Sequence, residues 1–314
     1  MKRIAIGIAA ITLLMGMPAV AADMPVKAPP PPPVPVYSWT GFYVGGNIGY
    51  GWGDPDTDLA ANGNVTSHTI CAFKGCVFTD IPSNFAFADS NAARLDGVIG
   101  GGQIGYNYQF SLNGVLGFEA DIQGSGERAS GQFADPFMLF TCFGANTPGV
   151  CLPNFITPFP GTVLTSYQAK IDWFGTVRGR LGALVTDQLL IYGTGGLAYG
   201  EVAVSGNANI NVNAGPPAGA SFTPTTAAFG ASKTNIGFTI GAGMEGRFSY
   251  WLPPNWTWKL EYLYLDLGSI DTPSTPFALL SSILGLASNI TGTINTHTHF
   301  TDNIVRVGLN YQFR

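Results

Sequence analysis

The chain has 314 residues, of which 46% are hydrophobic, 12% are aromatic and 11% are charged, and its formal net charge is −5. Soluble domains carry roughly 25% charged residues, so this composition is unusual for one. No run rich in Lys and Arg occurs, which excludes nucleic acid as an expected partner. Beyond the first residues, the most apolar stretch, Phe277–Ile290, is shorter than the roughly 20 residues that a membrane-spanning helix needs.

The first 22 residues have the pattern of a secretory signal peptide. Lys2 and Arg3 precede an apolar run, and small residues follow it, with cleavage expected after Ala21 or Ala22. Residues 23–38 are rich in proline and are expected to form an extended periplasmic spacer. The expected organisation is therefore a signal peptide at 1–22, a spacer at 23–38 and one outer-membrane β-barrel at 39–314. An exported chain that is low in charge and has no spanning helix favours such a closed barrel.

From residue 39 onward, eight segments alternate apolar residues with small or polar ones, and the phase is clear in all but the fifth. A period of two is typical of strands, and in a membrane barrel one face contacts lipid while the other faces the lumen. The segments are Trp39–Gly53, Leu95–Phe110, Val115–Gly124, Lys170–Val185, Leu189–Glu201, Asn235–Phe248, Trp256–Leu267 and Asn303–Phe313. The sequence therefore predicts an all-β fold, an eight-stranded antiparallel transmembrane β-barrel. Ten strands remain an alternative if a long connection contains another hairpin.

The connections between these segments alternate in length. Three are short and turn-like, at 111–114, 186–188 and 251–255. The others, at about 54–94, 126–168, 202–234 and 268–302, are long. Outer-membrane barrels have short periplasmic turns and long extracellular loops. We therefore expect extracellular loops at the four long connections, and both termini in the periplasm.

Charged residues in the predicted strands fall on the face opposite the apolar one. Placed inward, acids and bases nearly balance, and an eight-stranded barrel is just wide enough for side chains to fill it. Because buried charges need partners, we expect a salt-bridged interior. The predicted lumen network consists of Glu119, Asp121, Asp172, Arg178, Arg180, Glu245, Arg247, Lys259, Glu261 and Arg306. The alternative is a narrow polar path for small solutes.

Four cysteines would remain in the exported chain, namely Cys71, Cys76, Cys142 and Cys151. An even number in an exported protein favours disulfides, and three connectivities are open. The short spacings favour Cys71–Cys76 and Cys142–Cys151, while crossed pairs and free thiols remain alternatives. Neither pair has the two-residue spacing of a zinc site.

No cofactor, metal or catalytic group is expected. Two G-x-G-x-x-G matches, at 100–105 and 241–246, lie within predicted strands, whereas dinucleotide binding needs a helix directly after the glycines. His297 and His299 would share one face of a strand but have no evident third ligand. No Ser/His/Asp or Cys/His set is recognisable, so no enzyme is expected. A cluster of His, Asp and Ser at one loop rim would change that expectation.

Several strands carry distinctive motifs: WTGFYVGGNIGYGWG at 39–53, DWFGTVRGRLG at 172–182, TGGLAYG at 194–200, KLEYLYLDLG at 259–268 and NIVRVGLNYQF at 303–313. In this order they resemble the alphaproteobacterial outer-membrane immunogenic protein family, whose small barrels are often labelled porins. The resemblance implies an eight-stranded barrel that is exposed as a surface antigen and supports envelope integrity, without catalytic residues. It also implies a C-terminal assembly signal, here Tyr311 and Phe313, which Arg314 follows.

We therefore expect a structural, surface-exposed outer-membrane protein that presents extracellular loops, and a small-solute diffusion channel is the alternative. The expected partners are outer-membrane lipid and lipopolysaccharide, and the barrel-assembly machinery during insertion. Contacts with the cell wall or with a host surface are further expectations, and the sequence leaves the oligomeric state open.

Overall fold

The computed structural model describes residues 38–67, 81–142, 156–213, 220–248, 253, 255–283 and 286–313. The predicted signal peptide, nearly all of the spacer, and Cys71, Cys76 and Cys151 lie outside these residues, and of Cys142 the backbone alone is described. The disulfides and the leader therefore stay predictions. In the part of the chain that is described, no helix is long and apolar enough to cross a membrane.

The regular elements of the described residues are all β-strands, and each pair of neighbours is antiparallel. The all-β class that the alternation predicts is thereby confirmed. The strands are β1 (Gly41–Gly53), β2 (Asp56–Ser67), β3 (Ile81–Ala92), β4 (Leu95–Gln109), β5 (Gly114–Ser125), β6 (Arg128–Cys142), β7 (Ile156–Thr186), β8 (Leu189–Val212), β9 (Ala220–Phe222), β10 (Thr225–Arg247), β11 (Trp256–Asp271), β12 (Thr275–Ile283) and β13 (Leu286–Gln312).

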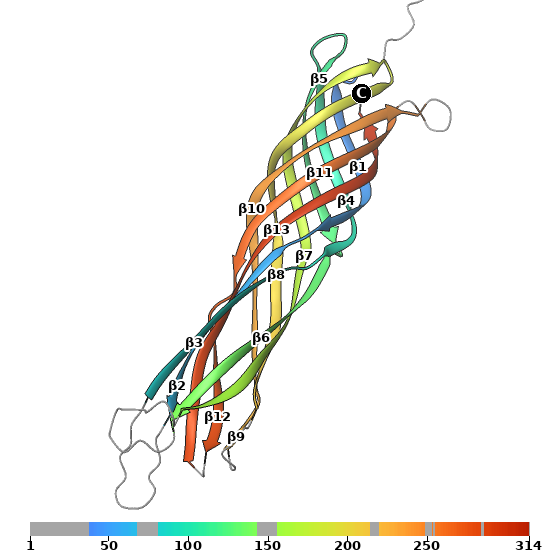
Figure 1. Cartoon of the computed structure of the whole chain (residues 1–314). Coiled ribbons are helices and arrows are strands. Elements are labelled where there is room, and N and C mark those ends of the chain that lie inside the picture. The colour runs from blue at the N-terminus through green and yellow to red at the C-terminus, as the bar shows by residue number, and fades with distance from the viewer. Residues whose placement is uncertain are drawn as a thin grey trace, which may run out of the picture. The chain divides into compact units, whose positions relative to one another are not determined.

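Eight of these strands close into a barrel, which Figure 1 shows from the side. Their order is β1-β4-β5-β7-β8-β10-β11-β13, and pairing between β1 and β13 closes the circle. Short connections join β4 to β5, β7 to β8 and β10 to β11 at one end of the barrel. The predicted eight-stranded antiparallel barrel is confirmed, and the connections at 111–114 and 186–188 are short, as the sequence predicts.

The four long connections differ from the expected loops, because strands continue through most of their described residues. β1 is followed by β2 after two residues, and both pair with β13. In the same way β5 and β6 both pair with β7, and β11 and β12 both pair with β13. β7 itself runs for 31 residues. Strand structure therefore continues well beyond several of the predicted segments, and β7 is about twice as long as the predicted segment Lys170–Val185.

These strands divide into two parts, which we name the ring and the extension. The ring comprises β1, β4, β5, and residues 173–186 of β7, 189–200 of β8, 236–247 of β10, 256–266 of β11 and 303–312 of β13. The extension comprises all the other strand residues.

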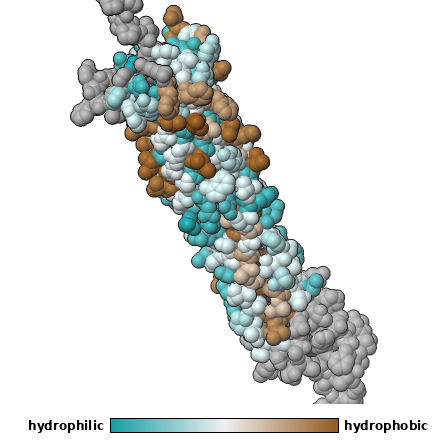
Figure 2. Space-filling view, turned by 180° about the vertical axis from the view of Figure 1, so that it is seen from behind, coloured by the Kyte–Doolittle hydropathy of each residue, from teal (hydrophilic) through white to brown (hydrophobic). Residues whose placement is uncertain are grey.

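The ring is apolar outside and polar inside. Phe42, Ile48, Phe118 and Ile240 are each more than half exposed on its outer surface. In Figure 2, hydrophobic side chains gather over the half of the barrel that carries the short turns, and paler or hydrophilic ones cover most of the other half. An apolar belt around a polar interior is the arrangement of barrels that span a membrane.

In the extension the two faces exchange polarity. Val204, Ala208 and Ile210 of β8 are buried, whereas Asn207 and Asn209, on the opposite face of the same strand, are exposed. The apolar side chains of the extension form one continuous cluster with the first buried apolar layer of the ring. This is the polarity of a water-soluble sheet pair with a hydrophobic core.

Aromatic rings connect the strands across the interior of the extension. Phe85 of β3 stacks on Phe137 of β6 with 5.3 Å between ring centroids, whereas the backbone of β3 pairs with β2 and the backbone of β6 pairs with β7 and β4. Phe159 of β7 meets Phe222 of β9 edge to face, also at 5.3 Å. Side-chain packing thus joins strand groups that backbone hydrogen bonds leave apart.

Candidate functional site

Eight charged side chains meet inside the ring. Each is at most 5% exposed, although they come from five different strands. They are Glu119 and Asp121 of β5, Arg178 and Arg180 of β7, Glu245 of β10, Lys259 and Glu261 of β11, and Arg306 of β13. Four carboxylates and four cations make this cluster formally neutral, which is the condition for placing so many charges in a narrow interior.

Glu119 lies at the centre of the cluster. Its Oε1 accepts hydrogen bonds from Arg178 Nη2 at 2.5 Å and from Lys259 Nζ at 2.8 Å. Its Oε2 accepts from the Tyr43 hydroxyl at 2.7 Å and lies 3.4 Å from Arg180 Nη1. Arg306 Nη2 lies 3.6 Å from Oε1 as well, so a single carboxylate is held by four cations and a phenol, and removing one of these cations would leave buried charge uncompensated.

The other three carboxylates extend the cluster around the lumen. Asp121 accepts from Arg178 and from Arg306, both at 2.9 Å. Glu261 lies 2.6 Å from the same Arg306. Glu245 accepts from Arg180 at 2.8 Å. Side chains that line an open aqueous path would be exposed to water, whereas these are buried, so the cluster fills the lumen at its own level.

Two predicted network residues lie elsewhere. Asp172 pairs with Lys170 at 2.6 Å, and both side chains are about one-third exposed. A register shift between Ile171 and Trp173 interrupts the alternation of β7, so Asp172 does not take the inward position that strict alternation gives it, and Ile171 is buried instead of facing lipid. Arg247 is the last residue of β10, two residues beyond Glu245 toward the short turns.

Residues outside the predicted set also contribute to the network. The Arg180 guanidinium lies 3.9 Å above the ring of Tyr192, whose hydroxyl donates to Glu261 at 2.9 Å. Thr176 donates to Asp121 at 2.9 Å. Tyr192 belongs to the predicted segment whose phase its glycines obscure, so no signal from the alternation identified it as an inward residue.

An apolar layer separates this cluster from a second acidic group. Ile99, Phe174, Leu263 and Ile304 occupy inward positions next to the cluster, toward the extension, and each is at most 1% exposed. Apolar side chains in this position insulate the charges of the ring from groups farther along the barrel.

Beyond that layer, Glu127 and Asp302 form a buried acidic pair where the ring meets the extension. Glu127 Oε2 accepts from the Ser125 hydroxyl at 2.7 Å, and both carboxyl groups are at most 1% exposed. Burial raises the pKa of Glu127. Burial, with the nearby Glu127 carboxylate, raises the pKa of Asp302 to about 9. At neutral pH the pair therefore holds a proton, which lets one carboxyl donate to the other.

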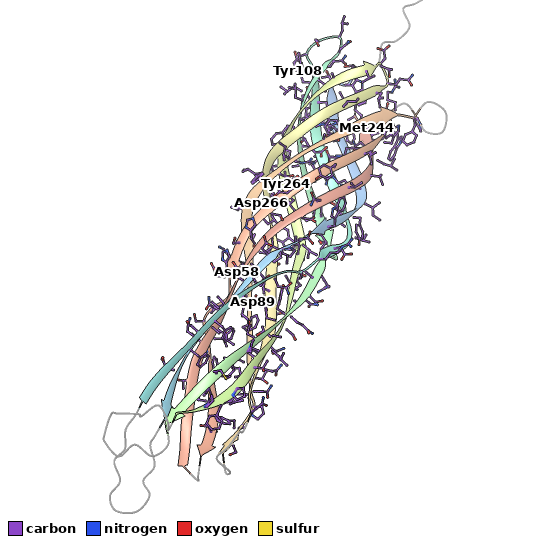
Figure 3. The ribbon with its side chains drawn as sticks, in the orientation of Figure 1. Asp58, Asp89, Tyr108, Met244, Tyr264 and Asp266 are labelled. Atoms are coloured by element: carbon purple, nitrogen blue, oxygen red, sulfur yellow. The ribbon has the colours of Figure 1, made fainter. Side chains whose placement is uncertain are left out.

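A different group lies on the outer surface at this junction. His299 Nδ1 is 2.9 Å from the Ser269 hydroxyl, and His299 Nε2 is 3.6 Å from Asp266 Oδ2. Figure 3 labels Asp266 and its neighbour Tyr264 along the middle of the barrel. The side chain of His299 is 41% exposed and that of Asp266 is 19% exposed. This Ser, His and Asp set was not evident from the sequence, and it lies on the outer surface along the middle of the barrel, not at a loop rim.

Strand pairing explains why these three residues escaped notice. Ser269 and His299 are 30 positions apart in the chain and become direct partners only through the register of β11 and β13. A bulge between Asp266 and Gly268 then turns Asp266 toward the same imidazole. Gly268 adopts φ +70°, a conformation that favours glycine, and its N–H donates to Asp266 Oδ1 at 2.8 Å.

The neighbouring His297 makes a simpler contact. Its Nδ1 lies 2.6 Å from Asp271 Oδ1, and both side chains are well exposed. In the residues that the structure covers, no three His, Cys, Asp or Glu side chains are placed to hold a metal ion. His297 and His299 therefore have separate carboxylate partners.

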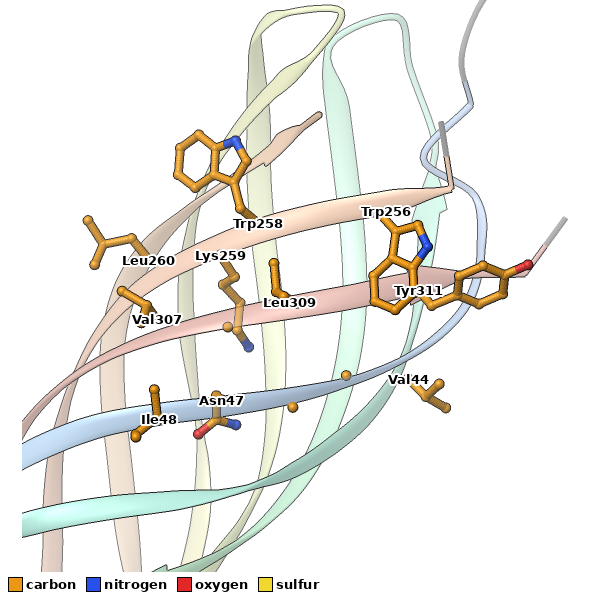
Figure 4. Close-up of a pocket in the computed structure, with 13 residues that line it drawn as sticks. Val44, Asn47, Ile48, Trp256, Trp258, Lys259, Leu260, Val307, Leu309 and Tyr311 are labelled. Atoms are coloured by element: carbon orange, nitrogen blue, oxygen red, sulfur yellow. The ribbon is translucent and has the colours of Figure 1, made fainter. Parts of the chain in front are cut away.

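A groove of about 1000 Å³ runs along the outside of the ring between β1, β11 and β13. Figure 4 shows Trp256, Trp258, Leu260 and Leu309 among its walls. The groove belongs to the apolar belt, where aromatic and aliphatic side chains suit contact with lipid.

Comparisons with known proteins agree with this architecture. A family model described as an outer membrane protein beta-barrel domain matches residues 8–313. The 31 kDa outer-membrane immunogenic protein of Brucella melitensis is 35% identical over 309 residues, which cover 98% of each chain. The 22 kDa outer membrane protein of Rhizobium leguminosarum bv. viciae is 30% identical over 251 residues, which cover 80% of this chain and 72% of the relative.

Among solved structures, the attachment invasion locus protein Ail of Yersinia pestis aligns with 79% of this chain and 97% of Ail, at 9% identity and a TM-score of 0.24. A likeness this distant supports no argument about function. The family model and the two relatives are sufficient by themselves to assign the chain to a family. The chain belongs to the family of outer-membrane β-barrel proteins.

Proposed function

We propose that this protein is a structural barrel that is closed to solutes, supports envelope integrity and holds its extension above the cell surface. The observation that carries the proposal is the buried, neutral cluster of eight charges inside the ring. A diffusion channel needs a wet lumen, whereas these side chains are bonded to one another. This structural role requires no catalytic activity.

The proposed orientation follows the design of bacterial barrels, in which short turns face the periplasm and long segments face outward. Both chain termini would then lie on the periplasmic side. The proline-rich residues 23–38 would form a spacer there after removal of the signal peptide, and Tyr311 and Phe313 would serve the assembly machinery. Lipid and lipopolysaccharide would surround the apolar belt.

Exposure of the extension also supports a proposed role as a surface antigen. The Brucella relative is named an immunogenic protein. In this chain the outward face of the extension carries polar side chains such as Asn207 and Asn209, which would be accessible to antibodies. Contacts with a host surface would be made by such polar outward residues, whereas contacts with the cell wall would be made on the periplasmic side by the spacer at 23–38.

The decisive test is single-channel conductance of the purified, folded protein in a planar bilayer. We expect a silent bilayer from the unmodified protein. The Arg178→Ala variant removes a cation that contacts Glu119, Asp121 and Glu261, so we expect it to leak or to lose stability. Arg94→Ala is the matched control, because Arg94 is exposed and its nearest carboxylate oxygen is 4.0 Å away.

Steady and reproducible openings of the unmodified protein would overturn the closed-barrel proposal and favour a small-solute channel. An Arg178→Ala variant with unchanged stability and no leak would show that the cluster does not seal the lumen. Heat-modifiable electrophoretic migration confirms that each preparation is folded before it is measured.

A further inference from the structure

The outward Ser269, His299 and Asp266 have the contacts of a nucleophile, a base and an orienting acid. The hydroxyl meets one ring nitrogen of His299 at 2.9 Å, and the carboxylate meets the other at 3.6 Å. In serine hydrolases an imidazole placed between a hydroxyl and a carboxylate accepts the hydroxyl proton during attack. That arrangement is recognised by geometry and not by the order of residues in the chain.

The backbone beside Ser269 adds a hydrogen-bond donor. The pairing of β10 with β11 ends at Phe238 and Asp266, and the Ser269 carbonyl accepts from the Asn235 side chain at 2.9 Å on that side. In an antiparallel strand, the N–H and C=O of one residue point the same way. The Ser269 N–H is therefore directed to a gap in the strand ladder, where it could stabilise a developing oxyanion.

The surroundings select the class of substrate. Ile236 and Phe238, on the outer face of the adjacent strand β10, are 77% and 50% exposed and belong to the apolar belt. On the other side, His299 is in register with the exposed Asp56 of β2, which begins the polar surface of the extension. The group thus lies where an acyl chain would be in hydrocarbon and its ester linkage would be at the water boundary.

We propose that Ser269, His299 and Asp266 form an esterase site that hydrolyses ester-linked acyl chains of membrane lipids. Ser269 Oγ attacks the carbonyl carbon while its proton moves to His299. The bond from that carbon to the alcohol oxygen breaks, and the departing alcohol takes the proton from His299. Water then attacks the acyl-Ser269 ester and gives a proton to His299. Release of the fatty acid returns that proton to Ser269, so one ester and one water yield one acid and one alcohol.

Ser269 and His299 are the catalytic residues of this proposal, and Asp266 is a positioning residue that acts through His299. The site is on the outer surface and does not involve the buried cluster of the ring. Esterase activity and closure of the lumen can therefore succeed or fail separately.

The test uses the full-length, folded protein in detergent micelles with p-nitrophenyl palmitate, and labelling by a fluorophosphonate probe. We expect Ser269→Ala to abolish labelling and to lower the hydrolysis rate by about 100-fold or more, as should His299→Asn. His297→Asn is the matched control. It lies two residues from His299 on the same strand, contacts a carboxylate and no serine, and should keep the rate within about twofold.

Two further measurements separate catalysis from a structural role. Asp266→Asn should lower kcat with little change in KM, because Asp266 positions the imidazole and does not contact the substrate. Fatty-acid release from phosphatidylethanolamine vesicles and from purified lipopolysaccharide would distinguish the two sources of acyl ester. Absence of hydrolysis and labelling in the folded unmodified protein, or an unchanged rate in Ser269→Ala, would overturn the proposal.

Discussion

The ring and the extension are built from the same continuous strands but bury opposite kinds of side chain. Along β8, Ile191 and Leu197 of the ring are exposed, whereas Val204 and Ile210 of the extension are buried. The register of the strand does not require this change, since inward and outward positions alternate in both parts. What differs is the solvent outside, which is lipid around the ring and water around the extension.

The two parts have different sources of stability. In the ring, burial of apolar surface inside contributes little, and the interior depends on mutual pairing of charges. In the extension, the hydrophobic effect acts on an ordinary apolar core. Substitutions that remove a partner in one part should therefore act through a different mechanism from those that remove volume in the other.

The largest effect is expected from Lys259→Met in the ring. Lys259 Nζ is 2.8 Å from Glu119, and its loss would leave a buried excess of negative charge, at a cost of about 3–5 kcal/mol in the free energy of unfolding. Urea unfolding in detergent, followed by heat-modifiable migration, measures it. Lys233→Met, at an exposed position of β10, is the control and should change stability by less than about 0.5 kcal/mol. If the two variants were equally stable, the paired charges of the ring would not contribute to its stability as we expect.

A somewhat smaller and more local effect is expected from Phe159→Ala in the extension. Phe159 is fully buried and packs against Phe222, so its truncation should cost about 3 kcal/mol. Hydrogen exchange should accelerate over residues 156–172 of β7 while residues 173–186 keep their protection. Leu164→Ala is the control, because Leu164 is half-exposed on the same strand. Acceleration throughout β7 would show that the two parts unfold as one unit.

The smallest effect is expected at the junction, from the Glu127 and Asp302 pair. The folded pKa of Asp302 is raised to about 9, above roughly 3.9 for an unfolded aspartate. The folded state therefore keeps a proton that the unfolded state releases, and stability falls as pH rises between about 4 and about 9.

We expect the melting temperature of the unmodified protein to fall by about 3 °C from pH 6 to pH 8, because Glu127 shares the proton and spreads the change over a wide range. Asp302→Asn cannot ionise and should lack this part of the decrease. Thermal melts at both pH values, followed by circular dichroism, measure the difference. Identical pH dependence in the two proteins would exclude Asp302 as the titrating group.

Much of the ring could be predicted from sequence because its alternation is strong. Large apolar residues such as Phe118 and Ile122 are separated by acids such as Glu119 and Asp121, which gives the faces a sharp contrast. The extension was mistaken for loops because its outward residues are Asn, Ser and Thr, which are typical of turns, and many inward residues are as small as alanine.

Individual site residues were harder to predict than the strands, because their positions depend on local geometry. Eight of the ten predicted lumen charges meet in one cluster because their strands keep strict alternation. Asp172 does not, since one bulge in β7 shifts the phase by a residue. The Ser269 group depends on strand register and on a second bulge, and neither is written in the spacing of the residues along the chain.

The length of β7 determines how far the outer end of the barrel lies from the ring. A strand of 31 residues measures about 100 Å from end to end at roughly 3.3 Å per residue. Some 17 of those residues, 156–172, belong to the extension and account for about 55 Å of that length. Because β7 continues as one strand from one part to the other, with a bulge at the boundary between Ile171 and Trp173, a pull or a push on the outer tip would be carried along the backbone to Arg178 and Arg180.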